Sequence, residues 1–301
     1  MLLVTTLVGG RDRPALPLGR TVRLPGRGST FVREQPGPPG APILMLLHGW
    51  SATADLNWHH CFGPLAEQFH VLAIDHRGHG RGLRHSAPFR LEDCADDVAA
   101  LATQLGIERL IAVGYSMGGP IAQLLWQRHR WLVDGLVLCA TSAAFGSSPR
   151  VRALFRVAAG LSATGAAGAA SSLAGSALEA VSRWNARRGE VPWGVEQLAQ
   201  HDWKQVIEAG RQIGRYDARA WIGSVSVPTA VVATTDDEVV PARDQIALAQ
   251  QIPSASLRIL PSGHHGCVTE PDKFVPALVD ACREVADRTR ARTPAAIVKV
   301  A

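Results

Sequence analysis

The stretch "VGYSMGGPIAQLLW", residues 113–126, places a serine between glycines where one apolar run meets another. The preceding run, residues 109–115, is short and rich in branched apolar residues, which is typical of a buried strand. Apolar residues then recur at helical spacing over residues 121–125. Ser116 therefore lies on a predicted strand-to-helix turn, where G-x-S-x-G indicates an exposed nucleophile. A Ser/Gly turn without chemistry is the alternative, and the rest of the chain decides between them.

Short apolar runs recur along the chain, and most are continuous, which is typical of strands covered on both faces. Helical patterns at residues 91–106 and 242–252 separate several of them. This alternation predicts an α/β fold with a mostly parallel, doubly covered sheet. Residues 18–34 are expected to add an antiparallel hairpin at one edge. The predicted strands are residues 42–49, 70–75, 110–116, 135–141, 229–235 and 256–261.

Residues 146–221 interrupt this alternation, because they contain no strand pattern. Residues 157–178 are dominated by Ala, Gly and Ser, a composition that also suits a flexible low-complexity linker. Helical periodicity follows this segment, and predicted strands lie on both sides of it. We therefore expect a helical insertion over one end of the sheet. This divides the chain into a core of residues 1–145 and 222–301 and an insertion of residues 146–221.

The composition is that of a globular protein with a large core, since the chain has 301 residues and 47% of them are hydrophobic. The formal charge is +5, but the arginines and lysines are scattered and no basic run with interleaved aromatics occurs. No nucleic-acid partner is expected. The insertion lacks the basic amphipathic face of a helix that lies on a membrane, so no membrane association is expected either.

The cysteines and the apolar N-terminus help to predict the cellular compartment of the protein. Five cysteines are widely spaced with no C-x-x-C pair, which predicts buried free thiols in a reducing environment. Residues 1–12 are apolar but lack a basic n-region, so we do not interpret them as a signal peptide. No run of bulky apolar residues is long enough to span a bilayer. The expected location is the cytoplasm.

A serine nucleophile needs a histidine base, and reactive groups in a parallel sheet gather at the carboxyl ends of strands. His264 and His265 are the histidines that follow the last predicted strand. Gly263 precedes His264 and allows the loop to turn and present that imidazole. We therefore expect His264 to be the base.

The acid that orients the base should follow an earlier strand. Residues 135–178 contain no Asp or Glu, whereas residues 229–235 are followed directly by Asp236, Asp237 and Glu238. The resulting order of Ser, Asp and His along the chain is the order associated with the G-x-S-x-G turn. Each residue alone is more often structural, but three matches at three strand ends favour a catalytic triad.

Acyl transfer also needs N–H donors for the developing oxyanion. The N–H of Met117, the residue after the serine, is one candidate. The other donor comes from a loop after an earlier strand, and residues 46–52 form such a loop, with the N–H of Trp50 as the candidate. His48 in this loop is interpreted as a structural hydrogen-bonding residue and not as a base.

Together these motifs make the sequence resemble the α/β-hydrolase superfamily, in its serine-nucleophile branch with a helical cap. The resemblance covers nearly the whole chain apart from the insertion. One departure is Arg81-Gly82, where family members carry a small polar residue in a loop brace. The matching pieces are "HGW" at 48–50, "DHRGHGRG" at 75–82, "GYSMGG" at 114–119, "DDEVVP" at 236–241 and "GHHGCVTEP" at 263–271.

The resemblance implies further expectations about the site. In the family pattern the orienting acid stands four residues before the proline that opens the next segment, and counting back from Pro241 gives Asp237. Asp236 is then expected to point toward the turn and accept backbone N–H bonds. The insertion is expected to be a cap that lines the substrate pocket. A serine at position 116 argues against the haloalkane dehalogenase and epoxide hydrolase branches, which use an aspartate.

The leading hypothesis is a serine hydrolase that cleaves an ester, thioester or lactone of a small to medium apolar acid through an acyl-enzyme. Ser116 attacks, His264 carries the proton and Asp237 orients the imidazole. C–C bond hydrolase, cofactor-free haloperoxidase, peptidase and acyltransferase chemistries remain open. A ligand receptor with vestigial turnover is the alternative from a different class.

No cofactor or metal is expected. The pair His76 and His79 lies in a glycine-rich loop that matches the family brace, and residues 59–61 ("HHC") lack usable zinc spacing. Cys267 lies near the histidine loop, but no second base serves it, so a buried thiol is the preferred interpretation.

Overall fold

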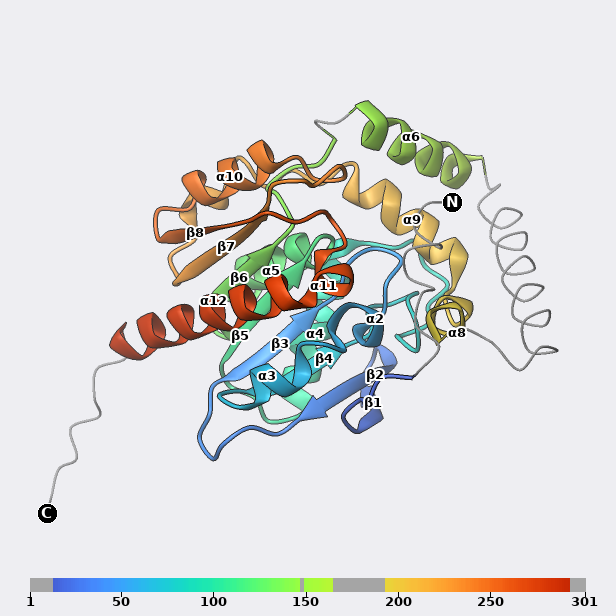
Figure 1. Cartoon of the computed structure of the whole chain (residues 1–301). Coiled ribbons are helices and arrows are strands. Elements are labelled where there is room, and N and C mark those ends of the chain that lie inside the picture. Colours follow the sequence, from blue (N-terminus) through green and yellow to red (C-terminus); the bar gives the residue numbers. More distant parts are fainter. Residues whose placement is uncertain (1–12, 147–148, 165–192, 293–301) are drawn as a thin grey trace, which may run out of the picture.

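One eight-stranded sheet runs through the computed structural model, which describes residues 13–146, 149–164 and 193–292 (Figure 1). Its order is β1-β2-β4-β3-β5-β6-β7-β8. The strands are β1 (Gly19–Leu24), β2 (Gly28–Gln35), β3 (Ile43–Leu47), β4 (His70–Ile74), β5 (Leu110–Tyr115), β6 (Val133–Cys139), β7 (Thr229–Thr234) and β8 (Ala255–Leu260).

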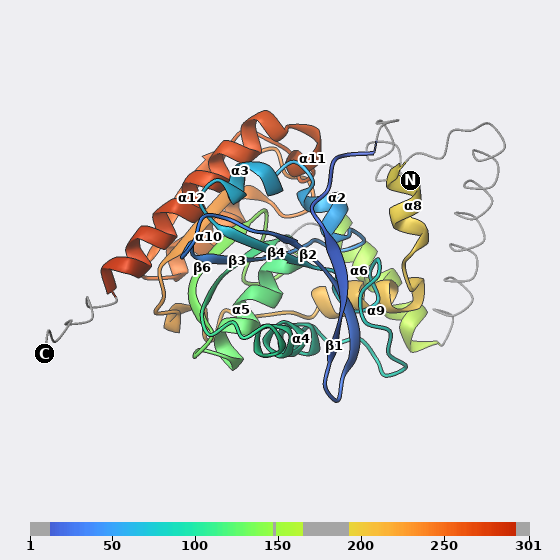
Figure 2. The same cartoon turned by 90° about the horizontal axis from the view of Figure 1, so that it is seen from below.

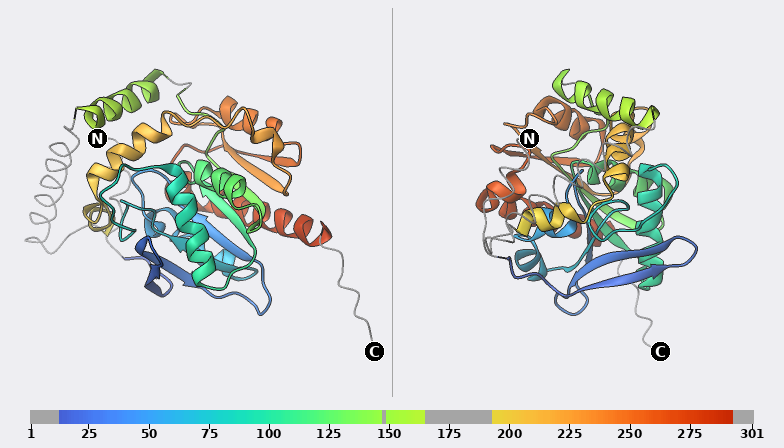
Figure 3. Two further views of the ribbon diagram at one scale, coloured as in Figure 1. Left: turned by 180° about the vertical axis from the view of Figure 1, so that it is seen from behind. Right: turned by 90° about the vertical axis from the view of Figure 1, so that its right-hand side faces the viewer.

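Strands β3 to β8 are parallel to one another, whereas β1 and β2 pair antiparallel and β2 joins β4 antiparallel. The mostly parallel sheet and the edge hairpin predicted from the sequence are both confirmed. The dark blue hairpin is seen at the edge of the molecule in the right-hand view of Figure 3. Leaving β1 and β2 aside, all six remaining strands correspond to predicted apolar runs.

Helices cover both faces of the sheet: Figure 2 shows α4 and α5 on one face and α3 and α12 on the other. The predicted helices at residues 91–106 and 242–252 are confirmed as α4 and α10. The helices are α2 (Ala54–Trp58), α3 (Phe62–Ala66), α4 (Leu91–Gln104), α5 (Gly118–Arg128), α6 (Pro149–Ala163), α8 (Trp193–Ala199), α9 (Trp203–Ile213), the 3-10 turn η1 (Ile222–Ser224), α10 (Ala242–Gln251), α11 (Gly266–Thr269) and α12 (Pro271–Arg292).

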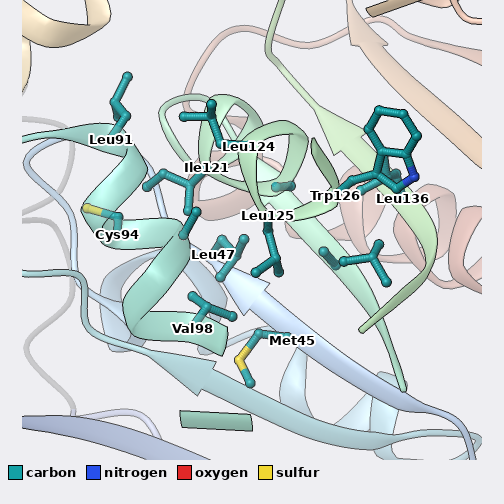
Figure 4. Close-up of a cluster of buried hydrophobic side chains, with 14 of the residues drawn as sticks. Met45, Leu47, Leu91, Cys94, Val98, Ile121, Leu124, Leu125, Trp126 and Leu136 are labelled. Carbon is teal, nitrogen blue, oxygen red and sulfur yellow. The ribbon is translucent and has the colours of Figure 1, made fainter. Parts of the chain in front are cut away.

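The continuous apolar sequence of β3 follows from this double cover. Successive side chains on a strand point to opposite faces. Met45 and Leu47 therefore pack with α4 and α5 (Figure 4), whereas Leu44 and Leu46 pack with the helices of the opposite face. All four side chains are fully buried. A strand with alternating polar residues would place those polar groups in one of these two cores.

Three described helices, α6, α8 and α9, come from the insertion between β6 and β7. Helices α6 and α9 lie against each other, at the top of Figure 1 and in the left-hand view of Figure 3. The side chain of Asp202 accepts a hydrogen bond from the Gln205 N–H and thereby caps α9. The rest of the Ala/Gly/Ser-rich segment, residues 165–178, lies outside the described residues, as do residues 1–12 and 293–301.

Among the helices of the described ranges, none combines the length and the apolar character needed to cross a bilayer.

Candidate active site

The turn between β5 and α5 presents Ser116 in a strained conformation. Its φ is +52°, in the left-handed region that residues with a Cβ rarely adopt. Glycines on both sides make this turn possible. A Cβ on Gly118 would lie 2.0 Å from the Leu47 carbonyl oxygen, and one on Gly114 would lie 2.3 Å from the Gly118 carbonyl oxygen. The G-x-S-x-G spacing is therefore a steric requirement of this strand-to-helix turn.

Three strand ends bring the sequence-predicted residues Ser116, Asp237 and His264 together. Ser116 Oγ lies 2.9 Å from His264 Nε2, and His264 Nδ1 lies 2.7 Å from Asp237 Oδ2. This arrangement fits an imidazole that donates its Nδ1–H to the carboxylate and accepts the serine proton at Nε2. His265 is not part of this chain of hydrogen bonds, and burial beside His264 lowers its pKa.

The carboxylate of Asp237 is held by more than the histidine. Burial raises its pKa, but the hydrogen bond and charge of His264, with donors from Val240 and Thr234, outweigh burial and lower the pKa overall. The Val239 and Val240 N–H groups donate to Asp237 Oδ1 at 2.8 and 2.7 Å. This corrects the expectation for Asp236: the turn N–H groups go to Asp237, because its buried Oδ1 faces them while Asp236 is exposed.

Two polar side chains that the sequence analysis did not single out complete this site. Thr234 Oγ1 donates to Asp237 Oδ2 at 2.8 Å, and Gln245 Nε2 reaches the same oxygen at 3.1 Å. Gln245 also donates to the Val240 carbonyl at 2.7 Å and is fully buried. The sequence signal for Gln245 was its place on the apolar face of a predicted helix. The sequence does not show its partner Asp237, which lies outside that helix.

The loop after β3 carries the proposed oxyanion donor Trp50. Within the described residues, the backbone N–H groups of Trp50 and Met117 make no hydrogen bond to the chain. Asn57 Oδ1 accepts the Gly49 N–H at 2.9 Å and fixes the loop beside them. The structural interpretation of His48 is confirmed, because its ring bonds the Gly49 carbonyl at 2.8 Å and accepts the His76 N–H at 2.9 Å.

A cavity of about 50 Å³ lies beside Ser116. Leu56 and Val268 give it apolar walls, and Trp50 and His264 also line it. Cys267 lines it too, but burial raises the pKa of its thiol to about 12. The thiol is therefore protonated at neutral pH and is a weak nucleophile there.

A family model described as "alpha/beta hydrolase fold" matches residues 42–271, more than half of the chain. The chain belongs to this family. Its similarity to named hydrolases extends over most of its length. It is 25% identical over 245 residues to 3-oxoadipate enol-lactonase 2 of Acinetobacter baylyi, covering 79% of this chain and 87% of the relative.

Two further comparisons concern this hydrolase. The solved enol-lactonase from Burkholderia xenovorans LB400 superposes with a TM-score of 0.70 at 25% identity, over 88% of this chain and 100% of that one. A bifunctional esterase/perhydrolase of Acinetobacter calcoaceticus is 39% identical over 84 residues, which span 28% of this chain and only 30% of that relative's length. The protein is thus an alpha/beta hydrolase enzyme, consistent with hydrolysis of carboxylic esters.

Buried histidines support the oxyanion loop of this hydrolase. The His48 ring lies 4.4 Å from His76 and 5.4 Å from His79, and His79 lies 5.4 Å from His201, all between ring centres. His201, between α8 and α9, accepts the Gly80 N–H at 2.8 Å. Within the described part of the chain, no group of three or more His, Cys, Asp or Glu is placed to hold a metal ion.

These histidines predict how the stability of the hydrolase depends on pH. Burial lowers the pKa of His48, His79 and His201 to about 3 from the ordinary value of 6.5. Between pH 3 and 6.5 the unfolded chain therefore binds more protons than the native state. The stability is fully present above pH 6.5 and falls as the pH falls, by up to about 1.4 kcal/mol per pH unit for each histidine.

His79→Asn tests this dependence, because an Asn amide can keep the hydrogen bond to the Arg77 carbonyl, which the His79 ring makes at 3.0 Å. The variant should show a shallower fall of unfolding free energy with decreasing pH, measured by urea unfolding. His85→Asn replaces an exposed histidine and is the control, which should keep the wild-type slope. A His79→Asn slope equal to that of the wild type contradicts the assignment.

Proposed function

We propose that this hydrolase cleaves esters, thioesters or lactones of short apolar acids through a Ser116–His264–Asp237 triad and an acyl-enzyme. The observation that carries the proposal is the unbroken line of two hydrogen bonds, 2.9 and 2.7 Å long, from Ser116 Oγ to the Asp237 carboxylate. A serine hydroxyl is a poor nucleophile until a base accepts its proton, and this arrangement supplies the base and the group that orients it.

In the proposed reaction, Ser116 Oγ attacks the carbonyl carbon while His264 Nε2 accepts its proton. The Asp237 carboxylate stabilises the imidazolium and keeps Nδ1–H directed at itself. The Trp50 and Met117 N–H groups stabilise the oxyanion, each donor contributing a factor of about 100 to 1000 in rate. His264 then protonates the leaving alcohol, thiol or lactone oxygen. Water, activated by the same histidine, attacks the acyl-enzyme and releases the acid.

The size of the cavity supports a short acyl group. A water molecule needs roughly 10–15 Å³ of such a cavity. The volume of about 50 Å³ beside Ser116 therefore suits a few non-hydrogen atoms, as in acetyl to butyryl groups. Apolar walls from Leu56 and Val268 favour an uncharged acyl chain at this point.

The roles of the insertion and the cellular location are also proposals. We assign residues 146–221 as a cap over the site, supported by the hydrogen bond of 2.7 Å from Trp50 Nε1 to the Val206 carbonyl in α9. All five cysteines are free and buried, which supports a reducing compartment such as the cytoplasm.

The proposal is tested on purified protein with a fluorophosphonate label and p-nitrophenyl esters of increasing acyl length. We expect labelling of Ser116, located by peptide mass spectrometry, and the highest kcat/KM for acetyl to butyryl esters. A steep fall should follow for longer chains, because they exceed the cavity. Binding without steady-state turnover would instead indicate a receptor. If an added alcohol speeds the release of p-nitrophenol and the ester of that alcohol with the acyl group is detected, the protein is an acyltransferase.

A further inference from the structure

A second cavity, of about 270 Å³, lies between α6 and α9 and is lined by four arginines. Arg152 and Arg156 come from α6, Arg211 from α9, and Arg215 follows α9. We call this cavity the arginine groove. No Asp or Glu is among its described lining residues. Since guanidinium groups remain charged at any physiological pH, the groove gathers four positive charges around one space.

Among the described residues, these four arginines have no hydrogen-bonding or ion-pair partner. In the part of the chain that the structure describes, none of the four guanidinium groups makes a hydrogen bond or ion pair, unlike Arg219, which pairs with Asp217 at 2.5 Å. Arg211 Nε is buried and unpartnered. A buried charged donor without an acceptor has lost water and gained nothing in return. An anion in the groove would supply that acceptor.

The walls of the groove indicate the kind of anion. A guanidinium group can donate two parallel hydrogen bonds to the oxygens of a carboxylate or phosphate. Four guanidinium groups offer more donors than a single carboxylate can accept. Phe145 and Phe155 add apolar surface, and a volume of about 270 Å³ is close to that of small-ligand pockets. We propose that the arginine groove binds an organic anion that carries at least two negative charges on phosphate or carboxylate groups.

The groove lies next to the candidate active site. The Phe155 ring lines the groove, and its centre is 6.1 Å from that of Trp50, which lines the cavity beside Ser116. Gly210 of α9 packs against the same indole, because a Cβ there would lie 2.6 Å from Trp50 Cζ2. The anion is therefore either a charged part of the substrate, which rests on the proposed function, or a separate ligand bound beside it.

Calorimetric titration with inorganic pyrophosphate at low ionic strength tests the site without turnover. We expect saturable binding to the wild type and to Ser116→Ala. The double variant Arg211→Gln/Arg215→Gln should weaken binding by about tenfold or more for each arginine removed. Arg211→Lys/Arg215→Lys should fall between them, because it keeps the charge but loses the forks.

The matched control is Arg23→Gln/Arg290→Gln, which removes the same charge from exposed positions on β1 and α12. It should bind pyrophosphate like the wild type. Absence of saturable binding to the wild type, or equal weakening in the control, overturns the proposal. Because calorimetry is independent of catalysis, a failure here is separate from a failure of fluorophosphonate labelling at Ser116.

A kinetic comparison distinguishes the two sources of the anion. Phenyl acetate and 4-acetoxyphenyl phosphate differ in a phosphate on the leaving group. If Arg211→Gln/Arg215→Gln raises KM for the phosphorylated ester alone, the groove binds a charged part of the substrate. If pyrophosphate binding is lost while both KM values stay unchanged, the groove binds a separate anion. Both results support the groove as an anion site.

Discussion

Replacing Ser116 by Ala is expected to abolish ester turnover, with a loss of about 10⁶-fold in kcat, and to abolish fluorophosphonate labelling. The Ser116 hydroxyl lies 2.9 Å from His264 Nε2 and is the proposed nucleophile, with His264 as its proposed base. The fold should persist, since the Ser116 carbonyl, not its hydroxyl, accepts the structural hydrogen bond from Thr141 Oγ1. The measurements are kcat with p-nitrophenyl acetate, the labelling rate, and circular dichroism with thermal unfolding.

The control for this prediction is Cys267→Ala, which removes the nearest alternative nucleophile. It should label at close to the wild-type rate, because burial keeps the Cys267 thiol protonated by raising its pKa to about 12. If Ser116→Ala still labels like the wild type and Cys267→Ala does not, the nucleophile is the thiol. The interpretation of the G-x-S-x-G turn as a nucleophile turn would then be wrong.

Asp237→Asn is expected to lower kcat by about 10⁴-fold, because the amide no longer holds His264 in the required tautomer and cannot stabilise the imidazolium. Asp237 Oδ2 lies 2.7 Å from His264 Nδ1. It also accepts bonds from Thr234 and Gln245, and an amide NH₂ in that place would face these donors. We therefore expect a lower melting temperature as well, with a native circular dichroism spectrum at room temperature.

The neighbouring variant Asp236→Asn is the matched control. Asp236 is exposed, and its carboxylate contacts the hydroxyl of Thr235 at 3.3 Å. Its kcat should remain within about tenfold of the wild type. If the larger loss falls on Asp236, the orienting acid is the preceding residue and the assignment of Asp237 must be abandoned.

Much of the fold could be predicted from local sequence patterns. The continuous apolar runs predict β3 to β7 because a strand buried on both faces must be apolar at successive positions, whereas the edge strand β8 is only partly buried. The turn at Ser116 could be predicted because part of its steric limit is local: a Cβ on Gly114 would lie 2.3 Å from the carbonyl oxygen of Gly118 in the same turn. The close approach of Gly118 to the Leu47 carbonyl of β3 is a tertiary contact. The choice of His264 rested likewise on a glycine and a strand end.

Other parts of the site depend on residues far apart in the chain. Choosing Asp237 over Asp236 required a family resemblance, because a local sequence pattern does not distinguish two adjacent carboxylates that follow the same strand. The expectation that Asp236 accepts the turn N–H groups was wrong for the same reason. The Val239 and Val240 N–H groups that bond Asp237 lie in the same turn. Only the packing of α10 on β7 shows that Gln245 reaches Asp237.

The sequence by itself thus determined the parallel sheet, the G-x-S-x-G turn and the positions of the proposed base and acid along the chain. Only the tertiary structure decided which carboxylate meets His264 and which side chains support it. It also decided that arginines about 60 residues apart, Arg152 and Arg211, line one groove. The physical reason is that apolar periodicity and turn geometry act between neighbours in the chain, whereas side-chain hydrogen bonds and charges act between neighbours in space.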